Sequence, residues 1–128
     1  MFDRPEVLGM ASAMAQNASV RLSAIARNVA NADTPGYRAM DAPSFAESYK
    51  GAGLVPMRAT RPGHIRPAGG GDGAGLVFRP DANLSPNGNN VSLETEMVAA
   101  AAVRRDHDLA LTIYKTSLGL LRASLGRR

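Results

Sequence analysis

An uninterrupted apolar repeat near the start of the chain places the strongest limit on its fold. Apolar side chains recur at alternating steps of three and four residues, at Leu8, Ala11, Ala15, Ala18, Leu22, Ile25, Val29 and Ala32. This spacing keeps them on one side of an α-helix, and such a repeat over several heptads is typical of a coiled-coil seam. It predicts a helix over residues 1–32, in which the seam from Leu8 to Ala32 is about 40 Å long at 1.5 Å per residue.

A second seam of the same kind occupies the other end of the chain. It runs through Leu93, Met97, Ala100, Arg104, His107, Leu111, Tyr114, Leu118, Leu121 and Leu125. Ser92 suits the N-cap position, and Glu94 and Glu96 suit the positive end of a helix dipole. The pattern predicts a helix over residues 92–128 that pairs with the first helix.

The region between the seams has the opposite character. Residues 33–91 hold ten of the 13 glycines and seven of the eight prolines, a composition that excludes long helices. We expect an extended loop region with little regular structure and short strands at Gly53–Arg58 and Gly75–Phe78. The fold class is therefore mainly α, with residues 1–32 and 92–128 paired as a coiled coil in one axial helical domain. Two helices bury each other on one side only, so this arrangement is typical of an assembly subunit.

Composition limits the partners of a single domain of 128 residues. The net charge of +4 permits a small basic helical nucleic-acid-binding protein, but the arginines scatter along the chain instead of concentrating on one element. Cysteine is absent from the sequence, which excludes disulfides and thiolate metal sites. No apolar run reaches the ~20 residues of a membrane span, and no cleavable secretory signal is predicted.

The chain also lacks a pattern for catalysis. Its two histidines are His64 and His107, and neither stands near a nucleophile or in the spacing that metal binding on a helix needs. The glycine-rich stretch 69–75 lacks the Gly-Lys-Ser/Thr ending of a phosphate-binding loop. We therefore predict no enzyme activity, no cofactor, no metal, no small-molecule substrate and no nucleic acid.

The stretch NVANADTPGY, residues 28–37, ends the first predicted helix. Pro35 and Gly36 suit the two central positions of a type II turn, which would return Tyr37 toward the helix end. An ordinary helix stop would account for this. However, Asn28, Asn31, Thr34, Gly36 and Tyr37 fit a known signature: Asn-Ile/Val-Ala-Asn, two residues, Thr, one residue, Gly-Tyr/Phe. With it the chain resembles the bacterial flagellar rod and hook proteins.

Three further features make the chain most similar to the basal-body rod proteins, and among them to the proximal rod proteins. The chain is short, residues 60–65 end in His64-Ile65, and Asn90-Val91 is followed by Leu93, Glu96 and Met97. The resemblance implies a structural subunit of the rod that transmits motor torque. The alternative within the family is the other short rod protein.

The resemblance also implies partners and a location. The helix-packing seams, represented by Leu8, Ala15, Leu22, Ile25, Val29, Leu93, Met97, Leu111, Tyr114, Leu118, Leu121 and Leu125, would contact other rod subunits and neighbouring axial proteins. Further partners are the adapter between rod and MS ring and the flagellar type III export gate. The subunit would be exported without a cleaved signal and would reside in the rod that spans the periplasm. Phe45 and Tyr49 fit the Phe-x-x-x-hydrophobic motif of early export substrates, with local packing as the alternative.

Overall fold

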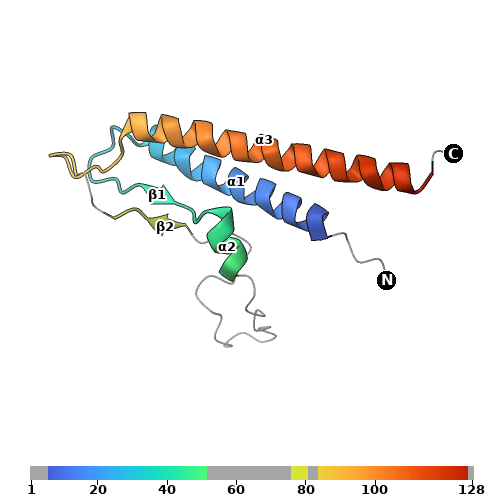
Figure 1. Cartoon of the computed structure of the whole chain (residues 1–128). Coiled ribbons are helices and arrows are strands. Elements are labelled where there is room, and N and C mark those ends of the chain that lie inside the picture. Colours follow the sequence, from blue (N-terminus) through green and yellow to red (C-terminus); the bar gives the residue numbers. More distant parts are fainter. Residues whose placement is uncertain (1–5, 52–75, 81–83, 127–128) are drawn as a thin grey trace, which may run out of the picture.

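The computed structural model describes residues 6–51, 76–80 and 84–126. The elements follow the order α1 (Glu6–Ala30), β1 (Met40–Asp41), α2 (Phe45–Gly51), β2 (Val77–Phe78) and α3 (Leu93–Ser124). The two long helices lie side by side, while α2 and the strands lie along one side of α1 (Figure 1). The prediction of a mainly helical chain with long helices at both ends is confirmed.

α1 and α3 pack through small side chains. The core contains Ala18, Ile25 and Val103, flanked by the half-buried Leu22 and Ala99. The helices run in opposite directions, since Asn28 near the end of α1 bonds Glu96 near the start of α3. Small residues let helix axes approach closely, which concentrates the contact in a narrow line.

The line of α3 that faces α1 differs in part from the predicted seam. Glu96, Val103 and Ala110, spaced by seven, are the fully buried side chains of this helix. Leu93 and Met97 are 48% and 65% exposed, and Leu125 is 84% exposed, so these three lie outside the contact within the chain. The buried line therefore lies on a different side of α3 from the start of the predicted seam. It includes Glu96, which sequence reasoning assigned to the helix dipole, because its carboxylate has polar partners inside the molecule.

The expected loop region contains regular structure of two kinds. β1 and β2 pair antiparallel, with Met40 opposite Phe78 and Asp41 opposite Val77, and β2 lies where a strand was predicted. The prediction omitted the short helix α2, so it was wrong there. The predicted strand at 53–58 and the glycine-rich stretch 69–75 lie outside the described residues.

Local hydrogen bonds explain why α2 forms. The Ser44 hydroxyl and backbone N–H both donate to the Glu47 carboxylate, at 2.8 and 2.9 Å, and the Glu47 N–H donates back to the hydroxyl. This is a capping box, which stabilises the first turn of a helix. Asn17 of α1 then holds α2 in place by donating to the Pro43 carbonyl at 3.1 Å.

No helix in the described part of the chain has the length and apolar character needed to span a membrane.

Candidate functional site: the joint between the helices

Three segments meet where α1 ends and α3 begins: residues 28–41, 77–79 and 87–96, which we call the joint. α1 ends at Ala30, and the chain then forms a turn in which the Tyr37 N–H donates to the Thr34 carbonyl at 3.3 Å. Gly36 has φ +70° at the third position of this turn. These features agree with the type II turn that Pro35-Gly36 predicts.

Asn28 is fully buried, and its amide bonds the backbone of β1. The Asn28 Nδ2 donates to the Met40 carbonyl at 2.8 Å, and its Oδ1 accepts from the Met40 N–H at 3.0 Å. The Tyr37 hydroxyl donates to the same Oδ1 at 3.2 Å. The side chain therefore completes the edge of β1 in the way that a neighbouring strand would.

The second contact of Asn28 brings in α3. Its Nδ2 donates to Oε2 of Glu96 at 3.1 Å, while Oε1 of Glu96 accepts from the Arg79 guanidinium at 2.6 Å. Glu96 has no exposed surface, whereas the Arg79 side chain is about a quarter exposed and also lies 3.8 Å from Asp41. A buried carboxylate is tolerated only when it is paired and hydrogen-bonded. Glu96 is both, and its partners come from α1 and from the residue after β2.

Asn89 caps the other side of the joint. Its Nδ2 lies 3.0, 2.8 and 2.9 Å from the carbonyl oxygens of Asn31, Ala32 and Thr34. Its Oδ1 accepts from the Val91 N–H at 2.7 Å. These carbonyls belong to the turn that follows α1, and one buried amide supplies donors to them from a segment more than fifty residues away in sequence.

Asn90 links the two strands. Its Oδ1 accepts from the Ala39 N–H at 2.6 Å, and its Nδ2 donates to the Arg79 carbonyl at 3.4 Å. Beside it, the Arg79 N–H donates to the Ala39 carbonyl at 2.8 Å. The amide thus extends the short ladder between β1 and β2 and ties it to the residues that lead into α3.

The chemical groups of the joint are suited to holding backbone segments together. Its groups are side-chain amides, backbone groups and one ion pair, and the buried amides have both donor and acceptor partners. Among the described residues, the one buried side-chain nitrogen or oxygen without a partner is Nε of Arg21, which lies outside the joint. Such a network fixes segments relative to one another and offers no activated group to a substrate.

The predicted signature residues all lie in or beside the joint. Asn28 and Tyr37 bond each other, while Asn31 donates to the Arg27 carbonyl at 2.8 Å and accepts from the Thr34 hydroxyl at 3.3 Å. Sequence reasoning did not assign Glu96, Asn89 or Arg79 to this site. Two residues of the joint, Asn90 and Glu96, belong to the motif Asn90-Val91 with Glu96 that was noted for its family resemblance. That motif was the signal in the sequence that could have identified them.

The predicted helix seams divide between buried and exposed positions. Ile25 is buried, and Leu8, Ala15, Leu22, Leu118 and Leu121 are half-buried. Val29, Leu111 and Tyr114 are more than a third exposed, and the last two line a groove described below. Phe45 and Tyr49 lie on α2 with ring centroids 5.5 Å apart, and Tyr49 is exposed.

Comparison with known proteins places this geometry in a family. A family model described as flagella basal body rod protein matches residues 10–38, which cover most of α1 and the turn of the joint. A flagellar basal body rod protein FlgB of Cereibacter sphaeroides is 31% identical over 101 residues, 79% of this chain and 73% of that protein. The chain belongs to the FlgB family of flagellar basal body rod proteins.

A second relative extends the match. The flagellar basal body rod protein FlgB of Agrobacterium fabrum is 29% identical over 115 residues, 87% of this chain and 86% of that protein. Both relatives carry the FlgB name, which decides between the two short rod proteins. The chain is thus a structural subunit of the proximal rod in the flagellar basal body.

Proposed function

We infer that the helix pair and the joint have separate tasks in the rod. The α1–α3 pair lies lengthwise against neighbouring subunits as a coiled coil, as the heptad spacing of both helices favours. The joint holds the middle region at a fixed position on that pair. Glu96 carries this inference, because one buried carboxylate bonds α1 and the residue that follows β2 at the same time.

A shaft that transmits motor torque needs subunits that resist internal shear. Displacing β2 from α3 would leave Glu96 buried without the Arg79 guanidinium, and displacing α1 would remove the Asn28 amide from the same carboxylate. Uncompensated buried charges and polar groups are costly, so small displacements are opposed. The joint is therefore suited to carry load from the middle region to the helix pair.

The family resemblance supports the remaining partners and the location. They are other rod subunits, neighbouring axial proteins, the adapter between rod and MS ring, and the type III export gate. The subunit is exported without a cleaved signal and resides in the rod across the periplasm. Phe45 and Tyr49 are the residues we propose for docking on the export gate, since α2 places their rings together beside the helix pair.

A complementation experiment tests the structural role. A deletion strain is supplied with the wild-type gene, with Asn28→Ala or with Ala13→Ser, an exposed position on the same helix. We expect Asn28→Ala to lower swimming and the amount of protein in purified basal bodies, while Ala13→Ser matches the wild type. Normal swimming of the empty deletion strain would contradict the rod role, and normal swimming of Asn28→Ala would contradict the task of the joint.

The export role has its own test. Phe45→Ala is expected to reduce secretion of the protein into the medium of a strain that lacks later rod components, and Ala46→Ser serves as the control. Circular dichroism of the purified variant should remain that of the wild type, because α2 is short and its capping box is intact. Wild-type secretion of Phe45→Ala would exclude Phe45 from export.

A further inference from the structure

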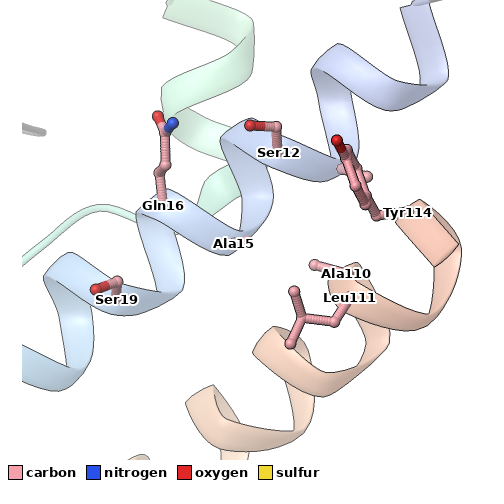
Figure 2. Close-up of a pocket in the computed structure, with 8 residues that line it drawn as sticks. Ser12, Ala15, Gln16, Ser19, Ala110, Leu111 and Tyr114 are labelled. Carbon is pink, nitrogen blue, oxygen red and sulfur yellow. The ribbon is translucent and has the colours of Figure 1, made fainter.

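A groove runs beside the α1–α3 contact, far from the joint. It has a volume of about 320 Å³ and is lined by small and uncharged residues: Ala11, Ser12, Ala15, Gln16, Ser19, Ala110, Leu111 and Tyr114. Figure 2 shows Ser12, Gln16 and Ser19 on α1, with Ala110, Leu111 and Tyr114 across from them on α3. Because Ala11 and Ala110 are buried between the helices, the groove is continuous with the contact inside the chain.

The wall of the groove continues along α1. Positions 12, 16, 19, 23, 26 and 30 follow steps of four and three and hold Ser, Gln, Ser, Ser, Ala and Ala. Five of them are exposed, and Ser12 is half-buried. This face is uncharged and shallow, so it can accept the ridge of another helix at a short distance between axes.

A matching ridge exists on α3 in the same chain, about 100° around the helix from the buried line of Glu96, Val103 and Ala110. Positions 98, 102, 105, 109, 113, 116 and 120 also follow steps of three and four. They hold Val, Ala, Arg, Leu, Ile, Thr and Leu, and all are exposed. Val98 is 73%, Leu109 52% and Leu120 68% exposed, which leaves large apolar side chains in water along several turns. Apolar surface of this kind on a helix marks a contact with a partner.

We propose that the ridge of α3 in one copy of this chain docks in the groove of the next copy. The two surfaces complement each other, because one carries large exposed apolar side chains with a single charge at Arg105, and the other is uncharged and hollowed. They also lie on different parts of the subunit, so the contact is heterologous: each copy uses its groove for one neighbour and its ridge for the other. A heterologous contact repeats from copy to copy and forms rings or helical assemblies. The proposal rests on the rod role and names one partner of the helix pair.

Cysteine cross-linking in purified basal bodies tests the proposal, since the natural chain has no cysteine. Gln16→Cys is combined in turn with Val98→Cys, Leu109→Cys or Leu120→Cys, which stand at intervals of three helical turns along the ridge. A short bismaleimide is added and the products are separated by size. We expect a ladder of dimers, trimers and larger products from one combination, which also fixes the stagger between copies.

Control variants distinguish the proposed contact from unspecific cross-linking. Gln16→Cys with Asp108→Cys is the control, because Asp108 is exposed next to Leu109 but lies about 100° away around the helix. Each single variant is treated alone. Dimers from a single variant, an equal ladder from the Asp108 control, or no ladder from any combination while the protein is in the rod fraction would each overturn the proposal. Absence of the wild-type protein from that fraction would instead contradict the rod role.

A charge substitution provides a second measurement that needs no cross-link. Leu109→Lys replaces a large apolar side chain of the ridge by a second cation, one turn after Arg105, at a position that is 52% exposed in the single chain. We expect an unchanged unfolding midpoint for the purified variant and loss of the protein from purified basal bodies. Asp108→Lys is the control and should still enter the rod. Entry of Leu109→Lys into the rod at the wild-type level would overturn the proposal.

Discussion

The two ends of the helix pair are built on different principles. At the joint, buried amides and the Glu96–Arg79 pair bond three segments that are far apart in sequence. Toward the start of α1 and the end of α3, the buried residues are the alanines Ala11 and Ala110, a groove remains open, and Leu120 and Leu125 are exposed. The first end is completed by the chain itself, whereas the second leaves its apolar surface for neighbours. In such a subunit the contacts of the joint form within the single chain, while the apolar surface at the other end is buried only when neighbouring subunits bind.

The largest effect is expected at the buried ion pair. Glu96→Ala should lower the free energy of unfolding by about 3 kcal/mol, the lower end of the range for removing one partner of a buried pair, because Arg79 keeps partial access to water. Glu94→Ala, exposed in the same helical turn, should cost less than about 1 kcal/mol. Urea unfolding measures both. Equal losses would show that the joint does not hold the chain together.

Removing the Asn89 amide from the turn that follows α1 should have the next largest effect. Asn89→Ala takes away the donor that serves three carbonyls, and we expect a loss of about 2 kcal/mol in the free energy of unfolding. Asn87→Ala removes a single acceptor, for the Asn89 N–H at 3.1 Å, from an exposed residue. Its loss should be the smaller one in the same urea titration, and the opposite order would contradict the capping role.

Two glycines should respond in opposite directions. Gly36 has φ +70° with open space around its Cα, so Gly36→Val meets backbone strain alone and should destabilise the chain by about 2 kcal/mol. Gly9 lies inside α1, also with open space, and Gly9→Ala should stabilise by about 0.5–1 kcal/mol. Thermal unfolding of the two variants provides the measurement. A tolerated valine at position 36 would mean that the turn adopts another backbone conformation.

The smallest effect on the single chain is expected at the open end. Leu120→Ser alters an exposed side chain, so the free energy of unfolding should stay within about 0.5 kcal/mol of the wild type. The amount of protein in purified basal bodies should nevertheless fall, because the apolar surface is used there. A stability loss as large as that of Asn89→Ala would place Leu120 in the core of the chain and remove the contrast between the two ends.

Sequence patterns were sufficient for the two long helices because their signals are local. Heptad spacing predicted both helices over residues 1–32 and 92–128, and the structure has α1 at Glu6–Ala30 and α3 at Leu93–Ser124. The turn at Pro35-Gly36 was also local in origin, since φ +70° needs glycine. Helix α2 had an equally local signal in the capping box Ser44-Phe45-Ala46-Glu47, which the glycine and proline content of its surroundings concealed.

The joint could not be derived in the same way. A glutamate in the first turn of a helix normally faces water and the helix dipole, and nothing adjacent in the sequence distinguishes Glu96 from Glu94. Its burial depends on Arg79, which stands 17 positions earlier, and on Asn28, 68 positions earlier. The same holds for Asn89, whose acceptors follow α1. Contacts of this range are set by the tertiary arrangement, so the line of α3 that is buried within the chain could not be derived from the heptad spacing.

Hydrogen exchange of the free chain, followed by mass spectrometry, tests the contrast between the two ends most directly. Amide protection reports the free energy of local opening along each helix. If the joint is complete in one chain, amides of residues 96–103 should be strongly protected, while those of residues 111–124 exchange early and become protected only in assembled basal bodies. Equal protection along α3 in the free chain, or stronger protection at its end, would contradict the account.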